Sequence, residues 1–228
     1  MKSASEPALT VSDRAYRCIR GDIMFGRLAP GQKLPLEKLR DRYDTSISTL
    51  REILHRLLSE GLVTAEGQRG FEVAPISADN FREIAEMRQL IESHALGESF
   101  AAGDIDWEGR IVAAHHKLSR IEQRMLAGDR SGAAAWKRYD REFHHALISA
   151  CGSQALLDTH AMVFDRYVRY QIIVVMFRGS EAADEHGALL HCALERDADE
   201  ACAILKRHIS ACVAYTVEHG SLPAAVLI

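Results

Sequence analysis

The sequence lacks the features that mark membrane and secreted proteins. Among its 228 residues no apolar run approaches the length of a membrane-spanning helix, which needs roughly 18 such residues. The N-terminus shows no charged stretch followed by an apolar one, so we expect no secretory signal. These absences favour a cytoplasmic protein that does not associate with a membrane.

Cysteine is scarce and shows no ordered pattern. The chain has 5 cysteines, an odd number without a CxxC pair, namely Cys18, Cys151, Cys192, Cys202 and Cys212. This set fits neither a disulfide framework nor a zinc ribbon. We interpret all five as reduced, buried thiols.

A strong charge of either sign is also missing. The net charge is -4 at pH 7, which argues against indiscriminate binding of nucleic acid. The charge is nevertheless uneven, because residues 1–75 hold 12 Lys/Arg against 10 Asp/Glu, while the remainder holds 16 against 22. Only the first third therefore suits a polyanionic partner.

Residues 44–62 form the stretch around which this first third is organised. Apolar side chains recur at three- and four-residue steps and predict one buried helical stripe: Leu50, Ile53, Leu54, Leu57 and Leu58. The other face begins with short hydroxyls and one guanidinium: Ser46, Ser48, Thr49 and Arg51. Ser46 or Ser48 can cap the helix. Taken alone, the stretch is an ordinary amphipathic helix, although a major groove also admits a helix of this kind.

The flanking segments favour DNA binding. Helical patterns cover residues 11–25 and 36–43, and two β-like runs follow at 62–65 and 71–74. Three helices and then a small hairpin is the order of a winged helix-turn-helix. The glycine-rich turn between the runs carries Gln68 and Arg69, which we expect at a tip that reaches DNA.

Four spaced blocks carry a family resemblance: residues 26–34, 46–54, 57–63 and 69–73. Through them residues 11–75 resemble the DNA-binding domain of the GntR family of bacterial transcription regulators. The resemblance implies that Ser46, Ser48, Thr49 and Arg51 face DNA and that Arg69 and Gly70 lie on the wing. Ile47 stands where the family usually has arginine, so one guanine-reading fork is missing.

The rest of the chain is predicted to be helical. About six helical segments with no strand pattern favour an antiparallel bundle: residues 81–101, 105–126, 132–150, 153–177, 181–194 and 199–218. In the first of them we expect Ile84, Met87 and Leu90 to point inward. The predicted fold is thus mainly α, with a winged helix-turn-helix in residues 1–75 and an all-α bundle in residues 76–228.

The bundle contains a candidate metal site. Asp140 and His144 are four residues apart and stack on one helix face, while His186 and His208 lie on two further predicted helices. One carboxylate and three imidazoles can hold a divalent ion. However, the chain has 11 histidines, and pairs with this spacing also occur on solvated faces. Spacing alone favours that simpler interpretation.

A second resemblance favours the metal. Arg88 to Glu92, Asp140 to Leu147, Glu185-His186 and His208-Ile209 resemble the FadR-type C-terminal ligand domain. It implies that Asp140, His144, His186 and His208 bind zinc, nickel or manganese, and that the metal holds a small organic acid. Arg88 would face this effector pocket and pair with the acid. The alternative for Arg88 is a surface ion pair with Glu92.

Two classes of function follow. The first is a homodimeric, ligand-responsive repressor that binds operator DNA, with the first bundle helix and residues 172–176 as candidate dimer surfaces. The second is a metal-dependent hydrolase or lyase that activates water. We prefer the regulator, because the sequence has no HExxH motif and an enzyme would have no use for the winged helix.

Overall fold

The computed structural model describes residues 10–65, 70–174, 177–220 and 222. The chain forms two compact units, Met1–Ile76 and Ser77–Ile228. Within the described residues no helix is both long and apolar enough to cross a membrane.

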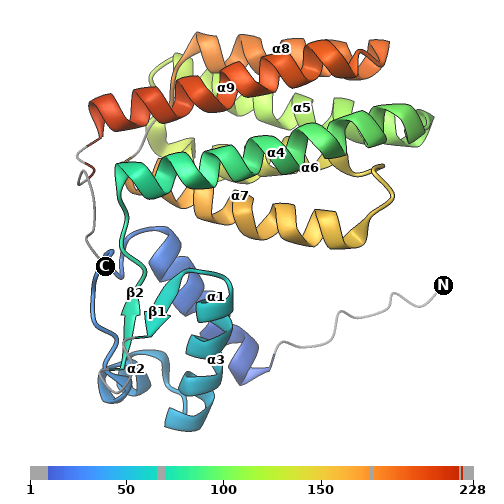
Figure 1. Ribbon diagram of the computed structural model, residues 1–228. Helices are drawn as coiled ribbons and strands as arrows, with labels where there is room; N and C mark the ends of the chain where they lie inside the picture. Colours follow the sequence, from blue (N-terminus) through green and yellow to red (C-terminus); the bar gives the residue numbers. More distant parts are fainter. Residues whose placement is uncertain (1–9, 66–69, 175–176, 221, 223–228) are drawn as a thin grey trace, which may run out of the picture. The chain divides into compact units, whose positions relative to one another are not determined.

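The first unit is a winged helix-turn-helix, as the sequence predicts. Its helices are α1 (Val11–Met24), α2 (Leu36–Tyr43) and α3 (Ile47–Ser59), followed by the strands β1 (Val63–Ala65) and β2 (Phe71–Val73). The strands pair antiparallel, with Val63 opposite Val73. Figure 1 shows the three helices gathered beside this hairpin.

Local chemistry sets the ends of α2 and α3. Asp44 ends α2 with a left-handed backbone, at φ 45°, a conformation that aspartate tolerates better than most residues. Ser46 then caps α3 by accepting the backbone N–H of Thr49 at 3.1 Å. The stripe of α3 is buried as predicted except for Leu58, which is only half-buried.

The second unit is a helical bundle, which confirms the predicted class. Six α-helices of the described chain build it: α4 (Ala78–Ala102), α5 (Ile105–Leu126), α6 (Ala133–Ile148), α7 (Gln154–Val174), α8 (Ser180–Glu195) and α9 (Ala198–His219). Helix α4 packs against α6, α7 and α9, and α5 packs against α6 and α8. Figure 1 shows these helices running side by side. The interior between them receives side chains from all six.

The prediction that Met87 and Leu90 point inward is wrong. Met87 is 48% exposed and Leu90 is 69% exposed. The inward face of α4 carries Arg88 and Glu92 instead, both buried. A hydropathy pattern places charged residues on the solvent side, so it predicts the wrong inward face for a helix that buries an ion pair.

The cysteine prediction is correct in part. All five thiols are free, and Cys192 and Cys212 are buried as expected. Cys18 is exposed, however, and Cys151 and Cys202 are only partly covered. Cys18 occupies the solvent face of α1, whose buried side is made by Ala15, Ile19 and Ile23.

Candidate metal centre and DNA-reading helix

The bundle brings all four predicted metal ligands together. Asp140 and His144 come from α6, His186 from α8 and His208 from α9. One ligand atom of each lies within 4.8 Å of the others, and all four side chains are buried. Oδ1 of Asp140 is 3.4 Å from Nε2 of His186 and 3.9 Å from Nε2 of His144. The four residues therefore face one small volume of the interior.

Each histidine of this cluster is held from behind by a carboxylate. Nδ1 of His144 lies 2.5 Å from Oε1 of Glu92. Nδ1 of His186 lies 2.8 Å from Oε1 of Glu122, and Nδ1 of His208 lies 2.7 Å from Oε2 of Glu185. A carboxylate at Nδ1 accepts the ring proton and leaves Nε2 free, as is common behind metal-binding histidines.

The free nitrogens show that these residues suit a metal ion. Nε2 of His144 and Nε2 of His186 are buried and have no hydrogen-bond partner among the described residues. Buried polar atoms rarely remain unsatisfied, and each such case calls for an explanation. A divalent cation between the imidazoles and Asp140 would satisfy both atoms, and this donor set suits a borderline divalent metal.

The electrostatics differ between the members of the cluster: Asp140 and His208 suit cation binding, whereas Asp140 and Glu122 raise the pKa of His186 to about 9. Burial would raise the pKa of Asp140, but its close approach to His186 and nearby positive charge hold that pKa well below the usual range. Burial lowers the pKa of His208 to about 3, and Glu185 offsets this only in part. His208 is therefore neutral at physiological pH, the form that binds metals.

Arg88 lies inside the bundle, so the surface ion pair considered for it is wrong. The pair with Glu92 exists, with Nε 2.8 Å from Oε2, but Arg88 is only 1% exposed and Glu92 is fully covered. The guanidinium lies over the rings of Phe164 and Tyr167, at 4.3 and 4.5 Å from their centroids. Its Nη2 is buried without a hydrogen-bond partner among the described residues. Arg88 thus keeps a donor available to a ligand.

Sequence reasoning missed the carboxylates behind the histidines. Glu122 was not singled out, Glu185 was named only as part of the resemblance, and Glu92 was considered only as a partner for Arg88. His160, whose Nε2 is 3.3 Å from Oε2 of Glu92, was missed as well. The one available signal was helical spacing, because Glu92 lies one turn after Arg88 and shares its inward face.

In the winged helix, the start of α3 carries the predicted DNA-contacting residues. Ser46 and Ser48 are exposed, and their hydroxyl oxygens are 2.8 Å apart. Thr49 is half-buried, with its hydroxyl 2.9 Å from that of Ser46. Arg51 is exposed and forms no hydrogen bond or ion pair with another described residue. The guanidinium of Arg51 is therefore available for an external partner.

The wing is described only in part. Gln68 and Arg69 lie outside the described residues. Gly70 has a φ of 97°, a conformation that favours glycine. It stands immediately before β2, which begins at Phe71.

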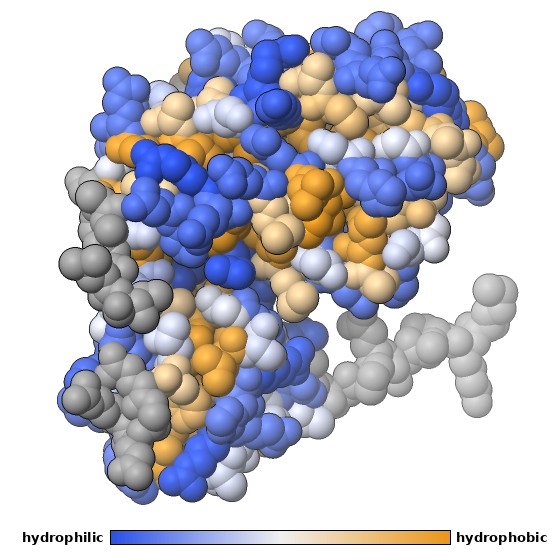
Figure 2. All heavy atoms as spheres, in the orientation of Figure 1, coloured by the Kyte–Doolittle hydropathy of each residue, from blue (hydrophilic) through white to orange (hydrophobic). Residues whose placement is uncertain are grey.

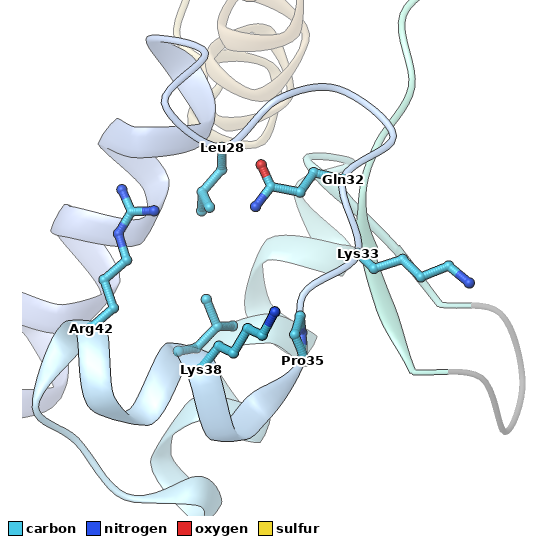
Figure 3. Close-up of a pocket in the computed structure, with 7 residues that line it drawn as sticks. Leu28, Gln32, Lys33, Pro35, Lys38 and Arg42 are labelled. Carbon is cyan, nitrogen blue, oxygen red and sulfur yellow. The ribbon is translucent and has the colours of Figure 1, made fainter.

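A second group of cations in this unit was not singled out from the sequence. Figure 3 shows a hollow beside α2, with Lys38 and Arg42 on the helix and Lys33 on the segment that precedes it. Arg42 is paired with Asp22 at 2.5 Å, whereas Lys33 and Lys38 are exposed. Lysines around a DNA-reading unit typically contact phosphates and fix its register without reading bases.

A winged helix joined to a helical bundle defines the class of DNA-binding regulators. Comparison with family models agrees with this class. Residues 11–73 match the model described as bacterial regulatory proteins, gntR family, and residues 83–211 match the FCD domain. The chain belongs to the GntR family of bacterial transcription regulators, and its FCD domain is consistent with the FadR subfamily.

Curated relatives are regulators too. The chain is 35% identical to the uncharacterized HTH-type transcriptional regulator BphR of Paraburkholderia xenovorans strain LB400, over 92% of this chain and 86% of the relative. It is 31% identical to the HTH-type transcriptional repressor GlaR of Escherichia coli K12, over 85% and 90%. These relatives decide for the regulator and against the hydrolase or lyase.

Solved structures share the fold. A GntR transcriptional regulator from Rhodococcus sp. RHA1 superposes with a TM-score of 0.72 at 21% identity, covering 91% of this chain and 97% of that one. McbR/YncC of E. coli gives a TM-score of 0.74 at 17% identity, covering 92% and 98%. At these identities the likeness concerns the fold alone.

Proposed function

We propose that this chain is a cytoplasmic repressor that binds operator DNA as a homodimer, and that a small carboxylate metabolite bound at a metal ion controls its affinity for DNA. The observation that carries the proposal is the buried cluster of Asp140 and three histidines, each histidine backed by a carboxylate. The name of the relative GlaR, a repressor, supports the direction of regulation.

The residues divide the work of effector binding between them. Asp140, His144, His186 and His208 would hold zinc, nickel or manganese. When bound, the ion supplies a Lewis acid that attracts a carboxylate. Arg88 presents its free Nη2 in the same interior, and a guanidinium binds a carboxylate with more directional specificity than an ammonium does. Without the ion, the acid would lose its strongest electrostatic contact.

The ligand set also suggests how binding is transmitted. The four ligands come from α6, α8 and α9, so an acid that alters the metal's surroundings acts on three helices at once. Regulation requires that the acid prefer one of two bundle states and thereby change the affinity for DNA. We propose that this preference arises at the metal centre.

A metal-dependent DNA-binding assay tests the proposed function. Chain purified without an affinity tag should retain one divalent ion in elemental analysis, and small organic acids should change its affinity for its promoter fragment. Treatment with a chelator should abolish the acid response, and zinc, nickel or manganese should restore it. Protein that stays metal-free after incubation with all three ions would contradict the proposal.

The homodimer has a candidate surface on α4. Met87 and Leu90 are exposed there, and Figure 2 shows apolar surface on the helical unit in the band where Figure 1 draws α4. On the other predicted surface, Ile172 and Ile173 are half-buried, and Val175 and Met176 lie outside the described residues. Two copies are expected, because one winged helix buries little surface and regulators of this kind bind paired half-sites.

Replacing Leu90 with aspartate should therefore weaken the dimer. A buried leucine contributes about 1.5–3 kcal/mol, and a two-fold interface contains it twice. We expect the dimer dissociation constant to rise by about a hundredfold or more. Light scattering at micromolar concentration measures this change, with Val112→Asp on α5, where Val112 is 44% exposed, as the matched control. Equal dimer stability in both variants would exclude α4 as the interface.

A further inference from the structure

A buried lysine lies beside the metal centre and takes no part in the roles assigned so far. Lys137 of α6 is 6% exposed. Its Nζ donates a hydrogen bond to Oε1 of Gln171 at 2.5 Å and lies 3.6 Å from the centroid of the Trp136 ring. Within the described part of the chain it forms no ion pair with a carboxylate.

Such a lysine is unusual in a protein interior. Lysine is almost never fully buried unless it is paired with an acid, because removing an ammonium from water is costly when no opposite charge compensates. Burial lowers the pKa of Lys137 to about 8, so the side chain still carries its proton at neutral pH. An ammonium has three donors, and one amide oxygen cannot satisfy them all.

Helix register places Lys137 next to the metal ligands. Rings of His144 on α6 and Phe164 on α7 are in contact, with centroids 5.6 Å apart. Lys137 precedes His144 by seven residues on α6, and Gln171 follows Phe164 by seven residues on α7. These two residues are joined by the hydrogen bond from Lys137 to Gln171. The two helices therefore run antiparallel, and Lys137 lies one turn before Asp140 on the same inward face.

Helix α9 extends the same layer. Nε2 of Gln171 donates to Sγ of Cys212 at 2.8 Å, and Cys212 follows His208 by one turn. Lys137, Gln171 and Cys212 thus form a layer of the interior, which we call the Lys137 layer. It lies one helical turn, or about 5 Å, from the metal ligands. Both Asp140 and Arg88 act electrostatically on Lys137, which agrees with a shared interior.

The interior therefore has two separate anchors for negative charge. One is the metal centre with the free Nη2 of Arg88, and the other is the ammonium of Lys137. We propose that the effector is a short dicarboxylic acid, with one carboxylate at the metal and Arg88 and the other at Lys137. The spacing of one turn suits about two or three methylene groups between the carboxyls. This inference rests on the proposed function and narrows its class of effector.

Calorimetry on zinc-loaded protein tests the inference. The probes are malonate, succinate, glutarate and adipate, each compared with the monoacid of the same carbon number. Wild-type protein should bind its best diacid at least about tenfold more tightly than the matching monoacid. The reason is that the buried ammonium of Lys137 makes a charge-assisted hydrogen bond to the second carboxylate. Lys137→Met should lose this preference while its affinity for zinc and for monoacids is unchanged.

Lys117→Met is the matched control, since Lys117 is 47% exposed on α5 and pairs with Glu142 at the surface. It should keep the preference for diacids. A Lys137→Met protein that keeps the preference would overturn the inference and leave Lys137 a core residue held by Gln171 and Trp136. If the variant does not fold, the comparison of diacid with monoacid in the wild type still tests whether the effector is a dicarboxylic acid.

The outcomes also separate this inference from the proposed function. If monoacids and diacids bind equally and only in the presence of zinc, the dicarboxylate class is wrong and metal-dependent sensing stands. If no acid binds the zinc-loaded protein, the proposed carboxylate site fails and the inference fails with it.

Discussion

Replacing Arg51 with alanine should remove specific operator binding while the chain stays folded and dimeric. Arg51 stands exposed near the start of α3, with no hydrogen bond or ion pair to another described residue. A bidentate contact to a base contributes about 1–3 kcal/mol of discrimination, and a homodimer makes the contact twice. That loss is comparable to the roughly 4–10 kcal/mol that separates specific from non-specific binding.

The measurement is a promoter-fragment binding assay at fixed salt, since affinities for DNA depend steeply on ionic strength. Arg56→Ala is the matched control, because it removes the same charge from the last turn of α3, where Arg56 contacts Tyr16 and Glu60. We expect this control to retain specific binding. An Arg51→Ala protein that binds its operator as tightly as the wild type would show that this end of α3 does not read bases.

Replacing Glu92 with glutamine should have the largest effect on the bundle. In the wild type, Nε of Arg88 lies 2.8 Å from Oε2 of Glu92. The change removes the charge of Glu92 and leaves Arg88 as a buried cation without an ionised partner. Breaking a buried pair in this way costs about 3–5 kcal/mol. For a unit of this size, the melting temperature of the metal-free protein should fall on the order of 10 °C. Because Glu92 also holds Nδ1 of His144, metal affinity should drop about 10- to 100-fold.

Thermal denaturation and zinc titration check the two parts of this prediction. Glu86→Gln, at an exposed position of the same helix, is the control and should change neither. The double variant Arg88→Met with Glu92→Met should recover most of the stability, because it removes both charges, and should still bind metal weakly. If Glu92→Gln melts like the wild type, the pair does not stabilise the bundle.

Much of this architecture could be predicted from spacing. The helix–helix–helix–hairpin order and the six bundle helices follow from local periodicity. A step of four residues places Asp140 and His144 on one helix face, although this spacing alone does not indicate a metal site. The convergence of His186 and His208 could not be derived this way, because it depends on how the bundle helices α5, α8 and α9 pack against one another and against the rest of the bundle. Resemblance to a family supplied that step.

What the sequence could not show are the charges that the bundle buries. Glu92, Glu122 and Lys137 resemble surface residues in any hydropathy pattern, since interiors accept charges only when other chain segments compensate them. The same bias assigned Met87 and Leu90 to the core of α4. Sequence patterns therefore predicted the helices well and the polar interior poorly.

The carboxylates behind the histidines also affect how the bundle opens. Glu92 belongs to α4, Glu122 to α5 and Glu185 to α8, while His160 of α7 contacts Glu92 as well. Together with the ligands on α6, α8 and α9, they link all six helices through one polar centre. If any one helix frays near this centre, a carboxylate or imidazole on another helix loses its buried partner. We therefore expect local opening and global unfolding to be coupled there, with the bundle behaving as a single cooperative unit around this cluster.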